Sequence, residues 1–494
     1  MNAFDRVLLA GSVLLVLLLL GPVLTIPLHI PINYNEGWNA GFDTRAMQPS
    51  AGPLYPGSDS FVFNNYPPLG FYIVGVAGLV FRDMIVGGRV VALAALFCCA
   101  GLLGLCVRQL GGTGRAACAA GLLLLLSTAT FYRSYVAMDD PQWLAHAMML
   151  GSLALLLRTG VPRRPEPGGP PPGRMILAAL LMVAGGFVKH NLVALPVAVT
   201  LWLAWLDRRL AIVWIAAAAA GACAGLGLTG ALFGSAAYSD ILHHPRVFHA
   251  YRLTRAIGGL APLLPMAIAA LALRRRVAGD GAVLVGLFAG VSLLTGIVQR
   301  MGEGVNYNAH FETMIAVCLG FGLVLAPLSR SPLPIRRRSI GPAALLVFAA
   351  LPVVGALPWR LPAAWHEIAD RKARQAAWQP MIERLAASRG PAGCEMPSVC
   401  IWAGKPFSVD IFNLTQSILS GRSAEPFRRM VARRGYAMFE YDPGSATHRN
   451  AIRSLGHDPV IGPFAGIYAP VATGPNGAIL LAPIDRPLPA AAAP

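Results

Sequence analysis

Polar side chains that could do acid–base or phosphate chemistry collect in short stretches between long apolar runs. These stretches contain Asn35-Glu36-Gly37-Trp38, Tyr66, Asp139-Asp140, Lys189-His190, His243-His244 with His249, and the segment from Arg300 to Glu312. An ionisable group at membrane depth is costly, so it is a functional candidate by default. If the stretches all face one side of a membrane, a single cavity there could bind a polar ligand, phosphorylated or glycosidic.

The apolar runs indicate a polytopic membrane protein. Charged residues make up 13% of the 494 residues and hydrophobic ones 55%, whereas soluble domains carry about 25% charge. Runs of about 20 apolar residues match the thickness of a bilayer. This composition excludes a cytosolic enzyme, a disordered scaffold and a disulfide-dense secreted module. The net charge of +17 does not indicate a nucleic-acid partner, because the arginines cluster between apolar runs, where they orient membrane helices.

We expect about eleven membrane-spanning helices with juxtamembrane helices beside them. The expected spans are 7–26, 84–107, 116–131, 138–157, 175–188, 190–206, 210–234, 256–273, 280–298, 310–328 and 339–357. The first run is too long for a signal peptide, so it is expected to remain as a span. Because Lys and Arg in short loops stay cytoplasmic, residues 66–81 should not cross but lie half-inserted against protein. Residues 162–173, rich in Pro and Gly, should form a structureless cytoplasmic linker.

Two domains are expected. Residues 1–357 form the membrane domain, with a long first outer loop at 27–83, and residues 358–494 form a tail on the outer, periplasmic side. Residues 398–402 and 436–441 look like strands, and 412–420 and 425–434 look like helices. That β-α-α-β order predicts a small α/β unit. Cys394 and Cys400 could pair in an oxidising compartment or remain free thiols.

Four motifs resemble the GT-C integral membrane glycosyltransferases. They are Asn35-Glu36-Gly37-Trp38 after the first span, Tyr66-Pro67-Pro68-Leu69 before the second, Asp139-Asp140-Pro141, and Asn306-Tyr307-Asn308. The resemblance covers roughly the first 330 residues. It is greatest to the polyprenyl-phosphate-sugar-dependent branch that includes protein O-mannosyltransferases and the lipid A aminoarabinose transferase. Residues 402–406 and 410–415 also resemble the tails of bacterial relatives. The family often has two acidic residues in the first motif, whereas here Asn35 precedes Glu36.

This resemblance suggests roles for the carboxylates. An inverting transfer needs one base to take the proton of the acceptor hydroxyl, and a carboxylate suits that task. Glu36 is the expected base; the alternative is a capping or solvated loop carboxylate. Asp139 and Asp140 would orient sugar or acceptor hydroxyls, although Pro141 also favours an N-cap and a first-turn acid. The pair could instead hold a divalent cation, as in some branches of the family, but the sequence shows too few oxygen ligands to assert a metal site.

The cations and amides are expected to bind the donor. A departing polyprenyl phosphate needs cationic stabilisation, for which Lys189 and Arg300 are the candidates. Lys189 could instead extend to the interface, and Arg300 could pair with Glu303. The remaining expected substrate-binding residues are Asn35, Trp38, Tyr66, His190, Asn306, Tyr307 and Asn308. His243, His244 and His249 fit an amphipathic surface segment better than a zinc site.

The sequence therefore predicts an inverting glycosyltransferase at the outer face of the inner membrane. It would move a hexosyl or pentosyl group from a polyprenyl-phosphate donor to a glycan, lipid or protein acceptor. A transporter or flippase of a lipid-linked saccharide would also place polar residues in a membrane cavity. The sequence shows no internal symmetry of the kind common in transporters.

Overall fold

The computed structural model describes residues 1–57, 59–161, 172–244, 246–277, 279–330, 333–335 and 338–484. They form two compact units. The membrane unit comprises Met1–Pro27, Tyr66–Ala237 and Phe248–Arg371, and the tail unit comprises Leu28–Asn65, Tyr238–Val247 and Lys372–Pro494. Residues 28–65 were expected in the membrane domain, whereas here they pack with the C-terminal residues.

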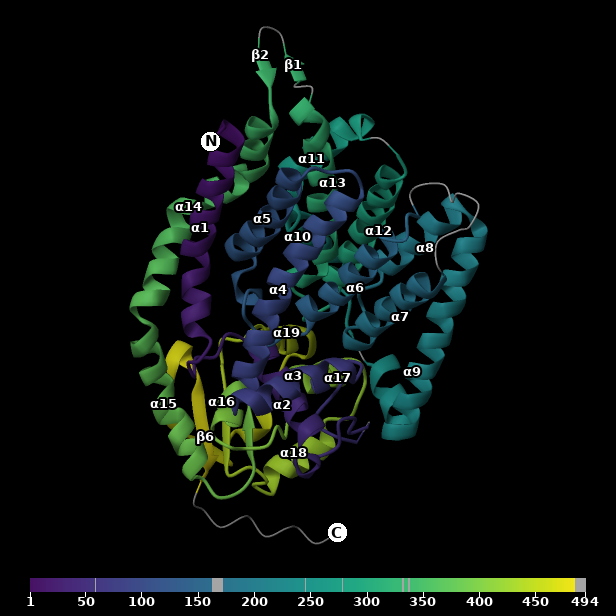
Figure 1. The fold of residues 1–494 in the computed structure, drawn as a ribbon. Helices are drawn as coiled ribbons and strands as arrows, with labels where there is room; N and C mark the ends of the chain where they lie inside the picture. The colour runs from purple at the N-terminus through teal and green to yellow at the C-terminus, as the bar shows by residue number, and fades with distance from the viewer. Residues whose placement is uncertain are drawn as a thin grey trace. The chain divides into compact units, whose positions relative to one another are not determined.

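The membrane unit consists mainly of apolar helices (Figure 1). Its helices are α1 (Ala3–Thr25), α3 (Leu69–Phe81), α4 (Met84–Gln109), α5 (Gly114–Phe131), α6 (Gln142–Leu157), α7 (Pro172–Val188), α8 (Ala194–Leu206), α9 (Arg208–Leu242), α10 (Leu253–Gly258), α11 (Leu264–Leu273), α12 (Gly281–Met301), α13 (Phe311–Arg330) and α14 (Pro342–Ala369). The last turn of α9 lies in the tail unit, beyond a break at Gly234. The strands β1 (Leu333–Ile335) and β2 (Arg338–Ile340) form an antiparallel hairpin.

Among the described residues, eight helical segments are long and apolar enough to cross a membrane. Four further apolar helices are shorter: Leu69–Phe81, Gln142–Leu157, Gly173–Val188 and Ala194–Leu206. Each of the eleven expected spans falls on one of these helices, which confirms a multi-pass, mainly α-helical membrane protein. Three expected spans, 138–157, 175–188 and 190–206, lie on shorter helices; residues 138–141 and 189–193 are not helical.

Burial identifies the centre of the membrane unit. The most apolar stretch of Tyr307–Leu328 is 94% buried inside the protein, whereas the most apolar stretch of Arg208–Leu242 is only 17% buried. Helix α13 is therefore packed on all sides by protein, and α9 presents most of its surface outward. An outward apolar surface is what lipid requires of a peripheral span.

Residues 66–81 contain a short helix, α3, that begins after Pro67-Pro68 and ends at Arg82 with a positive φ of 58°. It packs tightly on α4, since a Cβ added at Gly87 would lie 2.4 Å from the Gly78 nitrogen. Thirteen residues span about 20 Å at 1.5 Å per residue, which is shorter than a hydrocarbon core of about 30 Å. The expectation that this segment does not cross is compatible with that length and remains a prediction. The expected linker at 162–173 lies almost entirely outside the described residues.

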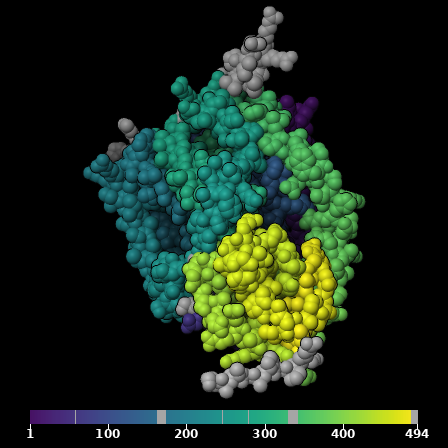
Figure 2. Space-filling model, turned by 180° about the vertical axis from the view of Figure 1, so that it is seen from behind, coloured from purple at the N-terminus to yellow at the C-terminus, as the bar shows by residue number. Residues whose placement is uncertain are grey.

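The tail unit is a small α/β unit. Its elements are α2 (Tyr34–Met47), α15 (Arg371–Ala387), β3 (Ala392–Cys394), α16 (Pro397–Trp402), α17 (Ile411–Leu419), α18 (Glu425–Ala432), β4 (Met438–Tyr441), α19 (Ala446–Leu455), β5 (Tyr468–Thr473) and β6 (Ile479–Pro483). The sheet order is β3-β4-β6-β5, with β3 and β4 parallel and the other pairs antiparallel. Figure 2 shows the C-terminal part of this unit, in yellow-green and yellow, as one continuous surface.

Alternation along the strands gives the sheet two apolar faces. Leu480 joins a buried cluster with Trp378 and Leu385, whereas Leu481 joins a second cluster with Phe439 and Phe464. Successive strand residues point to opposite faces, so both faces are covered. The expected α/β tail is confirmed.

The expected strand at 398–402 is wrong, because Pro397–Trp402 is helix α16 and the strand lies earlier, at Ala392–Cys394. Val399 and Ile401 suggested a strand, but Pro397 occupies a first-turn position of the helix, which proline favours. The expected helices at 412–420 and 425–434 and the strand at 436–441 match α17, α18 and β4. Cys394 and Cys400 form a disulfide that joins β3 to α16.

Candidate active site

Asp140 and Lys189 form a buried ion pair in the membrane unit. The Lys189 Nζ donates to the Asp140 Oδ1 at 2.8 Å, and the two side chains are 1% and 3% exposed. The same carboxylate oxygen accepts from the backbone N–H of Gln142 at 2.8 Å, so Asp140 also caps the start of α6. Buried charges are found where they are paired. Lys189 does not extend to an interface, because its ammonium lies inside the protein.

Tyr66 and His190 complete the surroundings of this ammonium. The Lys189 Nζ lies 4.7 Å from the centroid of the Tyr66 ring, a cation–π distance. The rings of Tyr66 and His190 are 6.4 Å apart. Tyr66 lies immediately before Pro67-Pro68 and α3, and Lys189 follows the last residue of α7. The ends of three helices, α3, α6 and α7, thus bring one carboxylate, one ammonium and two aromatic rings together.

Asp139 is also buried, at 1% exposure, and packs against α4. A Cβ added at Gly88 would lie 2.1 Å from the Asp139 Cγ, so the glycine provides the space for this carboxylate. The two neighbouring acids therefore face different partners, Asp139 toward α4 and Asp140 toward Lys189.

A second polar group joins the start of α6 to the turn before α13. The Asn308 Nδ2 donates to the Gln142 Oε1 at 3.3 Å, and the Gln142 Nε2 donates to the Asn308 backbone oxygen at 3.3 Å. The Gln142 Nε2 also lies 3.0 Å from the His146 Nε2. Gln142 and His146 were not among the expected site residues. Their signal in the sequence was two polar residues, four positions apart, inside an otherwise apolar run.

Arg300 lies at the end of α12, near the turn that holds Asn306 and Tyr307. Its Cζ is 5.0 Å from the centroid of the Tyr307 ring, and its Nη1 donates to the Val305 oxygen at 2.5 Å. Asn306 accepts from the backbone N–H of Tyr307 at 2.8 Å and so shapes the turn. The Glu303 Oε2 lies 3.0 Å from the His249 Nε2, so this carboxylate has a partner other than Arg300.

Glu312, near the start of α13, hydrogen-bonds to the start of another helix, α8. Its Oε1 accepts from the backbone N–H groups of Ala194 and Leu195 at 3.0 and 3.1 Å. These are the first two residues of α8, whose N–H groups have no partner within the helix. Glu312 therefore caps α8 from another helix.

Asn35, Glu36 and Trp38 lie in the tail unit, in the first two turns of α2. Asn33 caps this helix by accepting from the Asn35 N–H at 2.8 Å. Glu36 is fully buried, and its Oε1 accepts from the Ile32 N–H at 3.3 Å. The Asn35 backbone oxygen accepts from the Asn39 Nδ2 at 2.8 Å.

Asp410 anchors the same helix. Its fully buried carboxylate accepts from the Tyr34 hydroxyl, from the Trp38 Nε1 at 2.9 Å, and from the Asn413 Nδ2 at 2.6 Å. Burial raises the pKa of Asp410 above its usual value, and these hydrogen bonds lower it in part. The Trp38 indole thus has a structural partner inside the tail unit. Sequence reasoning missed this role of Asp410, because the bond to Trp38 joins residues 372 positions apart.

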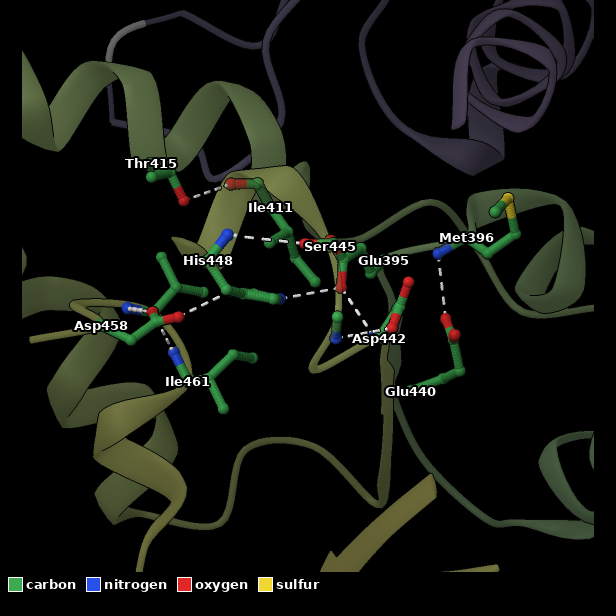
Figure 3. A network of polar contacts seen from close by, with 12 residues as sticks. Glu395, Met396, Ile411, Thr415, Glu440, Asp442, Ser445, His448, Asp458 and Ile461 are labelled. Atoms are coloured by element: carbon green, nitrogen blue, oxygen red, sulfur yellow. Dashed lines mark hydrogen bonds and ion pairs between the residues drawn. The ribbon is translucent and has the colours of Figure 1, made fainter. Parts of the chain in front are cut away.

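The tail unit contains a second charged network, drawn in Figure 3. The two ring nitrogens of His448 lie 2.9 Å from the Glu395 Oε2 and 2.7 Å from the Asp458 Oδ2. Burial lowers the pKa of His448, but the two carboxylates outweigh it and raise that pKa to about 9. With both nitrogens engaged, this histidine has no position left for acid–base work on a substrate. The network therefore has a structural role: through His448, it joins α19 to Glu395, just after β3, and to Asp458.

Metal binding gains no support from these contacts. Within the described ranges, no group of three or more His, Cys, Asp or Glu is arranged to hold a metal ion. Asp140, an expected ligand, is committed to Lys189 and to the start of α6. A divalent cation at Asp139 and Asp140 therefore stays a prediction from the family resemblance alone.

Comparison with known proteins relates the whole chain to solved structures. ArnT from Cupriavidus metallidurans matches with a TM-score of 0.62 and 15% identity, over 98% of each chain. The same protein bound to undecaprenyl phosphate matches with a TM-score of 0.63 and 16% identity, over 98% of this chain and 99% of that one. The Archaeoglobus fulgidus oligosaccharyltransferase, tethered with an acceptor peptide, matches with a TM-score of 0.51 and 12% identity, over 97% of this chain and 74% of that one.

The chain has the GT-C fold. Neither a family model nor a curated protein sequence matches it, so the likeness is one of fold. The expected GT-C architecture is confirmed over nearly the full length, tail included. Within this GT-C fold, the expected residues Tyr66, Asp140, Lys189 and His190 meet in the membrane unit. The roles of all expected site residues remain predictions.

Proposed function

We propose that this protein is an inverting glycosyltransferase that uses a polyprenyl-phosphate-linked sugar at the outer face of the inner membrane. The observation that carries the proposal is the buried ammonium of Lys189, held by Asp140 and Tyr66 among the helix ends of the membrane unit. A fixed cation in a water-poor site stabilises charge that develops on a leaving group. The likeness to a protein solved with undecaprenyl phosphate supports a lipid phosphate as that group.

Lys189 can serve both its partner and a phosphate. An ammonium has three donors; Asp140 accepts from one of them and the Tyr66 hydroxyl from a second, which leaves the third for a phosphate oxygen. Arg300 supplies a second cation, with donors beyond the one given to Val305. In the proposed reaction the acceptor oxygen attacks the anomeric carbon, the bond from that carbon to the phosphate oxygen breaks, and polyprenyl phosphate leaves. The anomeric configuration inverts because the attack comes from the face opposite the phosphate.

An apolar groove supplies a place for the donor lipid. A cavity of about 320 Å³ lies between α3, α7 and α9 in the membrane unit. Its lining includes Pro68 and Leu69, just after Tyr66, and Phe187, just before Lys189. A lipid whose phosphate is held at Lys189 would therefore find apolar side chains from the same two chain segments. We assign this groove to the first isoprene units of the donor.

Glu36 remains the proposed base. In the transfer it would accept the proton of the attacking hydroxyl. The helix that carries it is fixed at its first two turns by the hydrogen bonds from Tyr34 and Trp38 to Asp410. The likeness to an oligosaccharyltransferase solved with an acceptor peptide supports a protein as one class of acceptor, beside glycans and lipids.

The test is a transfer assay with purified protein in detergent, where transport across a membrane has no meaning. Polyprenyl-phosphate sugars are supplied with a panel of acceptors, and release of polyprenyl phosphate is measured. Transfer with inverted anomeric configuration in the product supports the proposal. If a donor shown to bind is never consumed, while the protein in vesicles flips that lipid, the glycosyltransferase proposal fails in favour of a flippase.

A further inference from the structure

A cavity of about 290 Å³, with both polar and apolar groups in its wall, lies inside the tail unit. Its wall comes from the first long loop (Gly57, Phe63), the end of α9 (Asp240, His243) and the segment after α17 (Arg422). Three chain segments far apart in sequence thus build one concavity. Its volume is at the lower limit of the range of about 300–1,000 Å³ for small-molecule sites, which suits a sugar ring or a short saccharide.

Arg422 contributes a guanidinium to the wall of this cavity. Its Cζ lies 5.2 Å from the centroid of the Phe63 ring, which holds the guanidinium plane in position. Its Nη1 is buried and makes no hydrogen bond within the described part of the chain. A guanidinium has only donors, and it binds carboxylate and phosphate groups with paired hydrogen bonds. The Asp59 carboxylate already acts electrostatically on this guanidinium, so an anionic substituent bound here would share Arg422 with Asp59.

The rest of the wall carries hydroxyl and carboxylate groups. Asp240 accepts from the Gly57 N–H at 3.2 Å through one oxygen, which leaves its other oxygen for a donor. The side chains of Ser239 and Ser420 also line the cavity, and their hydroxyls make no hydrogen bond among the described residues. A hydroxyl both donates and accepts. Such a mixture matches the hydroxyl groups of a sugar, each of which also donates and accepts.

One side of the cavity is held rigidly. The His244 Nε2 lies 3.1 Å from the Asn413 Oδ1, and the Asn413 Nδ2 donates to Asp410 at 2.6 Å. His244 is thereby tied to the buried carboxylate that also anchors α2. A wall fixed before binding loses little freedom when a ligand enters.

We propose that this cavity binds a saccharide that carries a carboxylate or a phosphate, with the acid on Arg422 and the sugar hydroxyls on Asp240 and the two serines. In the proposed transfer reaction this saccharide would be part of the acceptor, and that role rests on the proposed function. Binding itself does not depend on transfer, so the two can fail separately.

The test is saturation-transfer NMR on the purified full-length protein. The probes are glucuronic acid and glucose 1-phosphate, with glucose as the neutral comparison. Ser420→Trp should fill the cavity, and Ser454→Trp on the exposed surface of α19 is the matched control. Arg422→Gln removes the charge and keeps part of the side-chain length.

Both acidic probes should receive saturation from the unmodified protein and from Ser454→Trp, and lose it in Ser420→Trp. Arg422→Gln should weaken their binding roughly tenfold, the size of effect expected for a charge-assisted hydrogen bond, with glucose little changed. The proposal is overturned if neither acidic probe binds, if Ser420→Trp leaves the signal intact, or if glucose binds the unmodified protein as well as the acidic sugars do. A protein that binds the acidic sugars but transfers nothing would refute only the proposed function.

Discussion

At the scale of single residues, the pairing of Lys189 with Asp140 has two separable consequences. The pair stabilises the fold, because removing one partner leaves the other charged and buried, at a cost of about 3–5 kcal/mol. It also holds a cation ready for a phosphate. A stability measurement alone cannot distinguish these roles, and neither can an activity measurement alone.

Lys189→Met should therefore lower both stability and transfer, whereas Lys189→Met with Asp140→Asn should recover much of the stability and none of the transfer. The double variant removes both buried charges, so the penalty of an unpaired carboxylate disappears. The missing cation should still cost about 3 kcal/mol of transition-state stabilisation. Thermal unfolding in detergent and the polyprenyl phosphate release assay measure the two effects. Full recovery of transfer in the double variant would show that the ammonium serves only the fold.

Glu36→Gln tests the base directly. The amide keeps the shape of the side chain and its ability to accept from the Ile32 N–H, but it cannot take a proton. Turnover should fall by roughly 10²-fold or more, with the protein level unchanged. Near-normal turnover in a well-expressed variant would move the base to Asp139 or Asp140.

At the scale of elements, helix α2 depends on close contact with α16 inside the tail unit. A Cβ added at Gly37 would lie 2.1 Å from the Ser398 nitrogen, a backbone atom that cannot move without shifting α16. A second glycine, Gly41, faces the Phe407 ring, with 2.9 Å to the nearest ring atom from an added Cβ. The glycine of the first motif is thus required for packing.

Gly37→Ala should destabilise the tail unit by about 1–3 kcal/mol, the range for overpacked sites. Gly101→Ala in α4 is the control, because an added Cβ there meets nothing within 4 Å. Limited proteolysis of the tail unit reports the difference. Equal protease resistance of the two variants would mean that α2 and α16 do not touch as described.

The ion pairs of His448 with Glu395 and Asp458 predict how the stability of the tail unit depends on pH. The folded pKa of His448, about 9, exceeds the unfolded value of about 6.5, so its stabilisation is complete below pH 6.5 and is lost as pH rises through 9. Burial also raises the pKa of Glu440 from 4.5 to about 8, so the folded state keeps a proton that the unfolded state releases, and this adds a loss of stability between about pH 4.5 and 8. The free energy of unfolding should fall between about pH 6.5 and 9. In denaturant titrations His448→Gln should flatten this dependence, and an unchanged slope would contradict the assigned ion pairs.

The sequence predicted elements better than it predicted contacts. Apolar length alone located the spans, since lipid imposes a length and a composition on each of them. The strand expected at 398–402 was wrong because local β propensity is a weak guide beside a first-turn proline. The pairs Lys189–Asp140 and Trp38–Asp410 join positions 49 and 372 residues apart, and only the fold decides which distant polar residues meet.

At the scale of the whole molecule, the arginine clusters and the disulfide each bear on the orientation of the protein in the membrane. The arginine clusters favour a cytoplasmic position for the short loops that contain them. The disulfide between Cys394 and Cys400 requires an oxidising compartment in most organisms, so it favours a tail outside the cytoplasm. The two arguments are independent, because one uses charge and the other redox chemistry.

A reporter that is active only outside the cytoplasm should therefore be active when fused after Asp370, beyond the end of α14, and silent when fused within 162–173. The physical reason is that loops rich in arginine resist translocation, and an odd number of crossings results if residues 66–81 do not cross. Thiol labelling of intact cells gives a second readout: Cys394 and Cys400 should resist alkylation until a reductant is added. The opposite pair of reporter activities, with both cysteines freely alkylated, would mean that residues 66–81 cross the bilayer. The lipid-linked donor would then have to be used on the cytoplasmic face.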